Sequence, residues 1–271
     1  MSFLQKIGKH FKFYTKGFVA LCTLMVSASY GVLCSVFLSL IGKRNLAQWS
    51  TARFYYYLFS TVMRITIEIE GEEKLSGLPA ILISNHQSEL DVFMLGRIFP
   101  KRCVVTAKKQ LQLVPFLGWF MTLSGTFFLD RSDREKAIRV LNKALDDLKA
   151  TSGGLFMFPE GTRSYSSRPT LLPFKKGAFH LAVQAQIPII PLVVSNTSNI
   201  YSLKERNFNT GTIKVKVLEP ISTEGLTKDD VNKLVEATYA KMEEEIRKVG
   251  MSVVAGDVSG ESEALLSQEV Q

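Results

Sequence analysis

The chain has 271 residues, which is enough for one substantial domain with a small appendage. Its formal net charge of +8 and its hydrophobic content of 46% indicate an anionic partner, such as a membrane surface, a phosphorylated metabolite or a nucleic acid. The sequence contains no zinc-finger spacing, no basic region ahead of heptads and no RNP-like strand, so we expect no nucleic-acid partner. Its three cysteines form no C-x-x-C pair, which argues against a disulfide framework and a structural zinc site.

The first element in chain order is an uncharged apolar segment from Phe18 to Ile41. It exceeds the roughly 20 residues that cross a hydrocarbon core, and it is too long for the apolar region of a cleaved signal peptide. We therefore expect a retained membrane segment. It is either a single helix or, because "SASYG" lies in its middle, a helical hairpin that dips into the membrane and returns. Basic residues flank both ends, so the positive-inside rule predicts no orientation.

The aromatic stretch 54–63 is short and bounded by arginines, which is typical of a membrane interface rather than of a span. Residues 1–64 are thus predicted to form a basic N-terminal segment with membrane-associated helices.

Beyond residue 64, apolar runs with the period of strands alternate with helical periods, which predicts an α/β sheet covered on both faces. Strands are expected at 65–71, 79–84, 103–107, 125–131, 154–158, 188–195 and 212–220, the last of them at an edge of the sheet. Helices are expected after a Ser132–Glu135 capping box, at 177–186, and at 227–249 with Thr227 and Asp230 at its start. This domain covers 65–249. Residues 250–271 contain no Lys or Arg and many small residues, which predicts a disordered tail.

The stretch "NHQSELD" follows a predicted buried strand and holds one of the three histidines of the chain. Residues five apart on one helix diverge by about 140°, so His86 and Asp91 cannot meet there. If His86 lies in the loop and Asp91 in the first turn of the next helix, the two side chains can hydrogen-bond. The aspartate would then orient an imidazole that accepts a proton from a hydroxyl. The alternative is a histidine that only packs in a loop or caps a helix.

The stretch "FPEGTRS" is a tight polar turn after another buried strand. Arg163 carries a planar fork suited to phosphate, and Thr162 with backbone N–H groups can complete an anion cradle. The alternative is an ordinary turn with a solvated arginine. Three more cations, Arg131, Lys175 and Lys176, are either surface charges or converge on the same anionic ligand.

Four stretches occur in the order "NHQSELD", "GTFFLDR", "FPEGTRS" and "IPIIPLVV". Their order and spacing resemble the four motifs of the glycerolipid acyltransferase family, most of all the fungal 1-acyl-sn-glycerol-3-phosphate (lysophosphatidate) acyltransferases. The resemblance runs from about residue 31 to about residue 228. It implies an α/β fold with a mixed sheet flanked by helices, and a location in a membrane, the endoplasmic reticulum or a lipid droplet.

The resemblance also implies an activity: acyl transfer from acyl-CoA to the sn-2 hydroxyl of lysophosphatidate, which yields phosphatidate, a phospholipid precursor. His86 would be the general base and Asp91 its orienting partner. The glycerol phosphate would be bound by residues of the second and third motifs, namely Arg131, Glu160, Gly161 and Arg163. The fourth motif, which contains Pro188 and Pro191, is usually linked to the acyl donor; from the residues alone these prolines indicate an edge strand or a bulge.

Acyl transfer from a thioester needs a base and oxyanion donors, so we expect neither a metal nor a redox cofactor; acyl-CoA is a substrate. The absence of a G-x-S-x-G nucleophile favours direct attack by the acceptor hydroxyl over an acyl-enzyme. Three alternatives stay open: the same chemistry on glycerol-3-phosphate or another lysophospholipid, a membrane-anchored lipid-binding or scaffolding protein without turnover, and a metal-dependent hydrolase. The last needs more ligands than His10 and His180 supply. The sequence predicts no acyl-chain preference and no oligomeric state.

Overall fold

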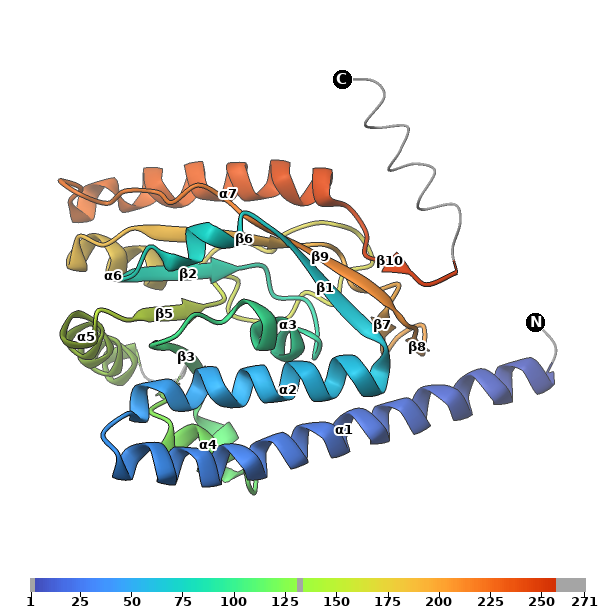
Figure 1. Ribbon diagram of the computed structural model, residues 1–271. Helices are drawn as coiled ribbons and strands as arrows, with labels where there is room; N and C mark the ends of the chain where they lie inside the picture. The colour runs from blue at the N-terminus through green and yellow to red at the C-terminus, as the bar shows by residue number, and fades with distance from the viewer. Residues whose placement is uncertain (1–2, 131–133, 257–271) are drawn as a thin grey trace.

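The computed structural model describes residues 3–130 and 134–256, and within them eight strands form one mixed sheet (Figure 1). The order is β1-β9-β6-β2-β5-β3-β4, with β10 beside β9. Most neighbouring pairs are parallel, whereas β6 and β10 run antiparallel to β9. The strands are β1 (Ile65–Glu70), β2 (Ala80–Ser84), β3 (Cys103–Lys108), β4 (Phe127–Leu129), β5 (Gly154–Met157), β6 (Ile189–Val194), β9 (Gly211–Val217) and β10 (Val253–Val254). A separate hairpin pairs β7 (Tyr201–Ser202) with β8 (Asn207–Phe208).

Helices cover both faces of the sheet, as the alternation of strands and helices predicts. The alternation of side chains along β2 separates the two layers. Leu82 packs with the helices α2 and α3, whereas Ile81 and Ile83 pack with the helices on the opposite face. The first face carries α1 (Phe3–Leu40), α2 (Ala47–Met63), α3 (Asp91–Ile98) and α4 (Leu117–Leu123), and the second carries α5 (Arg134–Thr151), α6 (Gly177–Ala185) and α7 (Val231–Val249). The expected α/β fold class is therefore confirmed.

The N-terminal apolar segment is part of α1, and α2 runs back along it. Between them lies a turn with a short 3-10 helix, Arg44–Leu46. Helix α1 is continuous through "SASYG", so the hairpin bends after Leu40 and not inside the apolar run. The ring of Tyr30 stacks on Phe54 at 4.4 Å, and its hydroxyl lies 3.0 Å from Ser50 Oγ. Within the described residues, α1 alone is long and apolar enough to cross a membrane, by length and composition.

One prediction about the second half of the sheet is wrong, and for the prolines of β6 the second of the two expected alternatives, a bulge, is the one observed. Strand β9 lies between β1 and β6, not at an edge, because its alternating pattern reports which face is buried and not which strands flank it. Strand β6 is also internal, so Pro191 is not in an edge strand. The pairing of β6 with the segment after β9 shifts by one residue between Ile189–Ile221 and Leu192–Val217. This shift is a bulge beside Pro191, where a residue without an N–H is tolerated.

The end of the domain also differs from the expectation. Disorder was predicted from residue 250, but Met251 forms a bridge to Asn196 and β10 pairs with β9. The prediction is therefore wrong for residues 250–256, because pairing with neighbouring backbone orders a segment whose composition is typical of disorder. Residues 257–271 lie outside the described residues. The capping box at Thr227 and Asp230 is confirmed, whereas Ser132 lies outside the described residues.

Candidate active site

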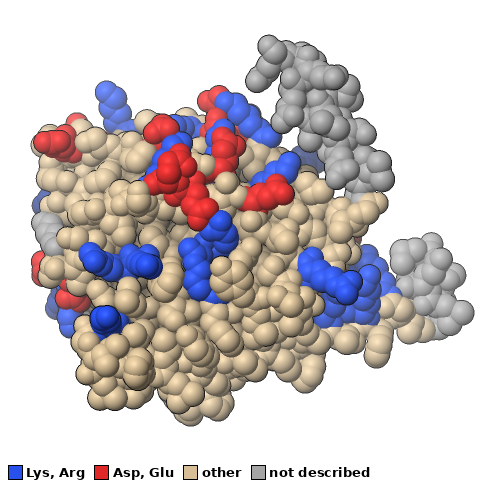
Figure 2. Space-filling model, in the orientation of Figure 1, with Lys and Arg blue, Asp and Glu red and all other residues tan. Residues whose placement is uncertain are grey.

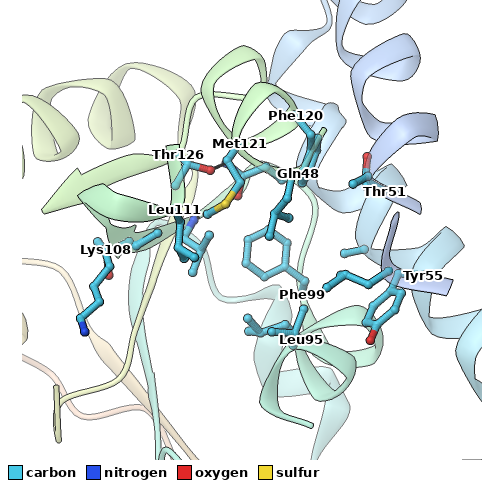
Figure 3. A pocket seen from close by; sticks show the side chains of 18 of the residues that line it. Gln48, Thr51, Tyr55, Leu95, Phe99, Lys108, Leu111, Phe120, Met121 and Thr126 are labelled. Atoms are coloured by element: carbon cyan, nitrogen blue, oxygen red, sulfur yellow. Dashed lines mark hydrogen bonds between the residues drawn. The ribbon is translucent and has the colours of Figure 1, made fainter. Parts of the chain in front are cut away.

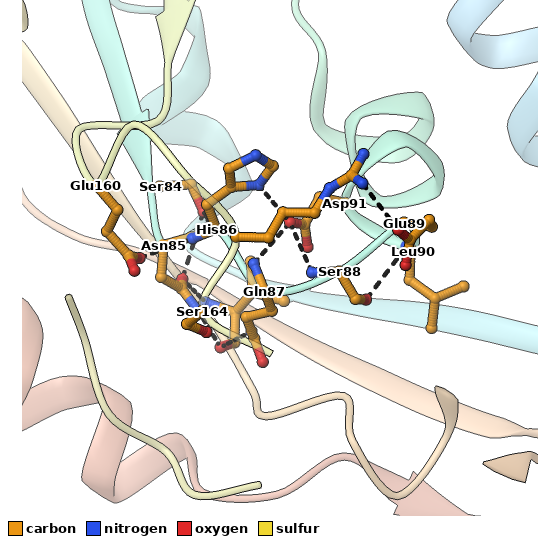
Figure 4. A network of polar contacts seen from close by, with 12 residues as sticks. Ser84, Asn85, His86, Gln87, Ser88, Glu89, Leu90, Asp91, Glu160 and Ser164 are labelled. Atoms are coloured by element: carbon orange, nitrogen blue, oxygen red, sulfur yellow. Dashed lines mark hydrogen bonds and ion pairs between the residues drawn. The ribbon is translucent and has the colours of Figure 1, made fainter. Parts of the chain in front are cut away.

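The site begins where β2 ends, in the loop that leads to α3. His86 lies in this loop and Asp91 is the first residue of α3, so the histidine Nδ1 lies 2.6 Å from Asp91 Oδ2. The same oxygen accepts hydrogen bonds from the backbone N–H groups of Gln87, at 2.7 Å, and Ser88, at 3.1 Å (Figure 4). Asp91 is only 2% exposed. The contact that the spacing of "NHQSELD" predicts is therefore present, with a buried carboxylate as the partner.

The ring of His86 has one nitrogen held and the other available. Because a buried carboxylate faces Nδ1, the proton lies on Nδ1 and Nε2 keeps its lone pair. Figure 4 shows Nε2 pointing away from Asp91. The ring stacks on Phe158 at a centroid distance of 4.0 Å and an interplanar angle of 15°. Its plane is thus set on one side by an aromatic ring and at one edge by a carboxylate. Such an imidazole is oriented to accept a proton at Nε2.

Two amides that the sequence analysis passed over hold this loop to the end of β6. Asn85 donates from Nδ2 to the carbonyl of Val194 and accepts the Val194 N–H at Oδ1. Gln87 donates to the carbonyls of Val194 and Ser195 and accepts the N–H of Thr197. Both amides are buried, and hydrogen bonds occupy them on both sides. The signal in the sequence was an Asn and a Gln directly after a buried strand, where a polar side chain needs an internal partner.

Glu160 lies behind the histidine rather than facing an open site. Its Oε1 accepts the backbone N–H of His86 at 2.8 Å and its Oε2 accepts that of Leu172 at 3.0 Å. Its side chain is 3% exposed. Burial raises the pKa of Glu160 to about 7, and the charge of Asp91 adds to this rise while the two N–H donors oppose it. Glu160 therefore joins the two loops of the site, and its geometry is that of a positioning residue.

The backbone of the second loop follows that of the first. The N–H of Ser164 donates to the carbonyl of His86 at 2.9 Å, and that of Tyr165 donates to the carbonyl of Gln87 at 3.1 Å. Gly161 has a φ of +70°, and a Cβ there would lie 2.8 Å from the Lys175 side chain. The turn thus favours glycine at this position because of its conformation, since the flexible end of the Lys175 side chain could move away from a Cβ.

Arg163 and Tyr165 form the rim of the site with Glu89. Glu89 Oε1 accepts a hydrogen bond from Arg163 Nη1 and another from the Tyr165 hydroxyl, each at 2.8 Å. All three side chains are partly exposed. The predicted phosphate ligand Arg163 therefore reaches the site, but with one amino group already engaged by Glu89, a contact that the sequence did not indicate. Thr162 lies beside it and is exposed. The predicted Arg131 lies outside the described residues.

A cavity of about 510 Å³ opens beside His86 and runs between the sheet domain and the N-terminal helices. His86, Phe158, Thr162 and Arg163 line it at the site. Figure 3 shows side chains of α2, α3, β3 and α4 converging on it, among them Tyr55, Leu95, Phe120 and Met121, together with Phe99 directly after α3. Leu24, Ser27 and Ala28 of α1 complete the wall. The N-terminal helices α1 and α2 thus contribute directly to a mainly apolar cavity.

The buried amide of Gln48 in this wall is held within the protein. Gln48 Nε2 donates to Thr126 Oγ1 at 3.1 Å, and Gln48 Oε1 accepts the N–H of Val105 at 3.1 Å. Both ends of the amide are therefore occupied, so Gln48 joins α2 to the sheet and leaves the cavity suited to an apolar ligand.

Comparison with known proteins identifies the family that this chain resembles along its length. A family profile described as "Acyltransferase" matches residues 66–195. The chain is 50% identical over 256 residues to the 1-acyl-sn-glycerol-3-phosphate acyltransferase of Saccharomyces cerevisiae, a match that covers 94% of this chain and 84% of that protein. It is 38% identical over 200 residues to the human 1-acyl-sn-glycerol-3-phosphate acyltransferase alpha, covering 73% of this chain and 70% of that one.

Among solved structures, the chain is similar to the 1-acyl-sn-glycerophosphate (LPA) acyltransferase PlsC of Thermotoga maritima. The TM-score is 0.56 at 21% identity, and the match covers 81% of this chain and 95% of that chain. At this identity the similarity shows a common fold.

Proposed function

This chain belongs to the 1-acyl-sn-glycerol-3-phosphate acyltransferase family, and on that basis we propose that it transfers an acyl group from acyl-CoA to the sn-2 hydroxyl of 1-acyl-sn-glycerol-3-phosphate, forming phosphatidate and free CoA. The observation that carries the proposal is the His86–Asp91 pair, whose free Nε2 lies at the wall of an apolar cavity. A base and an acyl-sized cavity at one place are what acyl transfer to an alcohol requires.

The reaction follows from the geometry of His86. Nε2 accepts the proton of the sn-2 hydroxyl while the oxygen attacks the thioester carbonyl. Asp91 holds the ring and stabilises the imidazolium that forms. The carbon–sulfur bond then breaks, and the imidazolium returns its proton to the leaving CoA sulfur. The ester bond replaces the thioester bond, so the step consumes no cofactor.

The acyl chain is assigned to the cavity and the phosphate to its rim. Apolar side chains of α1, α2, α3 and α4 surround the space beyond His86, and burial of each methylene there contributes about 0.8 kcal/mol. Arg163, with Thr162 beside it, supplies the positive charge next to the base. Glu160 and Gly161 are better suited to shaping the loop than to contacting phosphate, since both Glu160 oxygens accept backbone N–H groups. Arg131 keeps its proposed role in phosphate binding.

The arrangement of α1 supports membrane association within one leaflet. Near its start, Phe13 is buried against Tyr201 and Phe208 of the β7–β8 hairpin. Near its end, Gly31 approaches Phe120 of α4. These two contacts are about 27 Å apart along the helix, close to the thickness of a hydrocarbon core of about 30 Å. A spanning α1 would therefore draw the sheet domain into the lipid. We assign α1 and α2 to one membrane surface, with the endoplasmic reticulum or a lipid droplet as the compartment.

The activity is tested by expressing the wild type and His86→Ala in membranes that lack it. Labelled oleoyl-CoA is supplied with lysophosphatidate, glycerol-3-phosphate or lysophosphatidylcholine, and phosphatidate and free CoA are followed. We expect phosphatidate only with lysophosphatidate and only when His86 is present. A preference for another acceptor would keep the chemistry and overturn the substrate. Folded wild-type protein without turnover on any acceptor would overturn the proposal.

A further inference from the structure

The net charge of the chain is concentrated in its N-terminal part. The first 67 residues contain eight Lys and Arg residues and no Asp or Glu. The remaining 204 residues contain 25 basic and 25 acidic residues, so their charges cancel. The formal charge of +8 is therefore that of the segment that forms α1 and α2. A segment with this balance repels cations and attracts an anionic surface.

Part of this charge lies along one stripe of α1. Lys9, Lys12 and Lys16 are separated by three and four residues, which places them on one side of the helix. Within the same turns, Phe13 is buried against Tyr201 and Phe208, and this contact fixes the stripe against the β7–β8 hairpin. The lysines are thus held on a rigid support rather than on a free helix end.

The hairpin adds two cations to the stripe. Its turn carries Lys204 and Arg206, both exposed, and Arg206 Nη1 lies 2.7 Å from His10 Nε2 of α1. Glu205 is the single carboxylate of the hairpin sequence 201–208. We call Lys9, Lys12, Lys16, Lys204 and Arg206 the basic surface. Figure 2 shows a group of Lys and Arg side chains beside the N-terminal half of α1, while acidic side chains lie mainly toward α7.

The same helix exposes an apolar stripe. Phe11 and Phe18 are 72% and 68% exposed, and Ile7, Tyr14 and Leu21 lie on the same side at helical spacing. Below α2 in Figure 2 the surface is almost without charge. At about 100° per residue the apolar stripe lies on the side of α1 opposite to Lys9, Lys12 and Lys16. An apolar side opposite a basic side is the pattern of a helix that lies along a membrane surface, with its apolar side among the acyl chains and its lysines at the headgroup level. A nucleic acid or an acidic protein surface does not fit this arrangement, because such a partner would pair with the lysines and leave the exposed phenylalanines in water.

We propose that the basic surface binds the anionic headgroups of a phospholipid leaflet, and so directs the enzyme to membranes rich in negative charge. The apolar stripe would insert below the headgroup level while the five cations contact phosphate and carboxylate groups above it. The inference rests on the proposed function in one respect: the acceptor is itself an anionic lipid, so the same surface would raise its concentration near the site. Charge-dependent binding is a property separate from turnover and is measured separately.

The test compares the full-length wild type with the variant Lys9→Gln/Lys12→Gln/Lys16→Gln. Protein diluted from detergent is mixed with vesicles of phosphatidylcholine alone or with added phosphatidylserine, and the bound fraction is measured by flotation at low and high salt. Each lysine near an anionic surface changes partitioning roughly fivefold, so the variant should bind the anionic vesicles on the order of 100-fold more weakly. Binding to neutral vesicles should be unchanged, because the apolar stripe is intact.

The matched control removes three lysines from the opposite side of the molecule. The variant Lys228→Gln/Lys233→Gln/Lys241→Gln lowers the net charge by the same amount, at residues just before and within α7. It should keep the wild-type preference for anionic vesicles. Equal binding of the wild type to both kinds of vesicle would overturn the proposal. The proposal would also be overturned if the α1 variant kept the preference for anionic vesicles, or if the control variant lost that preference to the same extent as the α1 variant. Acyl transfer by the wild type in detergent micelles is assayed in parallel. Absence of transfer in a wild-type protein that still prefers anionic vesicles would overturn the proposed function and leave the membrane proposal standing.

Discussion

The two loops that build the site are held in different ways. The loop after β2 is in the interior: Asn85, Gln87 and Asp91 are buried and hydrogen-bonded, and they leave His86 little freedom. The loop after β5 is buried at Glu160 but emerges at Arg163 and Tyr165. Proton transfer depends steeply on distance and angle, whereas capture of a charged acceptor tolerates motion. We therefore expect the first loop to govern turnover and the second to govern binding of the proposed acceptor.

The largest expected effect is that of His86→Ala. Removal of the base should lower kcat by a factor on the order of 100 to 10,000, with little change in the KM values. The side chain stacks on Phe158 but lies in a loop, so the loss of stability should be small. Initial rates with lysophosphatidate and acyl-CoA, alongside the thermal unfolding midpoint, measure both. A rate near that of wild type in folded protein would remove the general base from the mechanism.

Asp91→Asn should be nearly as damaging, for two separable reasons. The neutral amide carries no charge to stabilise the imidazolium, and its oxygen at the Oδ2 position accepts the same hydrogen bonds more weakly. In the other orientation its NH₂ group faces the N–H donors of Gln87 and Ser88. We expect kcat to fall on the order of 100-fold or more and unfolding stability to fall by about 1–3 kcal/mol.

Because His86 and Asp91 act as one unit, the double variant should be no slower than His86→Ala alone. Multiplication of the two losses would show that Asp91 acts independently of the histidine.

Glu160 tests the buried part of the second loop through pH. Its pKa is raised to about 7, so the neutral acid is favoured in the folded protein. The contribution of Glu160 to the free energy of unfolding is present in full below a pH of about 4.5 and is lost as the pH rises through about 7. The free energy of unfolding changes by about 3 kcal/mol over this range. Wild-type unfolding free energy should fall over this range, and Glu160→Gln and Glu160→Ala should both remove that part of the slope. Denaturant unfolding across pH measures it; an unchanged slope in both variants would show that Glu160 does not titrate there.

Much of the first loop could be predicted from the sequence because its contacts are local. A buried strand followed by an N-terminal helical turn can bring residues five apart together, so the spacing predicted the His86–Asp91 contact as one of two alternatives, the other being a histidine that only packs in the loop or caps a helix. The helix and strand assignments followed in the same way from the periods 3.6 and 2.

The second loop and the cavity depend on contacts across the sequence. Glu160 resembles a surface residue of a polar turn until β5 is known to lie beside β2, which brings its carboxylate to the His86 N–H. The cavity needs α1, α2, α3 and α4 at once, and no local pattern specifies how helices stack. The order of strands is likewise not encoded in alternation, which is why β9 was expected at an edge.

Arg163→Ala should act mainly on binding of the acceptor. A hydrogen-bonded charge lost at the rim corresponds to about 1.5–3 kcal/mol, or roughly a 10- to 150-fold rise in the KM for lysophosphatidate. The KM for acyl-CoA and the turnover at saturation should change far less, because His86 is held by other contacts. Arg163→Lys keeps the charge without the planar fork and should fall between. Equal increases in both KM values would indicate a structural role for Arg163.

The smallest effect is expected at Glu89, where two consequences oppose each other. Glu89→Gln weakens the hold on Arg163 and Tyr165, which costs acceptor binding about 0.5–1.5 kcal/mol in ordering a long side chain. It also removes a carboxylate that competes with phosphate for the guanidinium, and an exposed pair of this kind is worth only about 0.2–1 kcal/mol. At the midpoints of these ranges the ordering cost exceeds the gain by about 0.4 kcal/mol, so the KM for lysophosphatidate should rise about twofold at unchanged kcat. Tyr165→Phe, which removes one donor to Glu89 and no charge, should change it in the same direction and less. A fall in KM in Glu89→Gln would mean that the carboxylate restrains Arg163 from the phosphate, so that the rim must open before the acceptor binds.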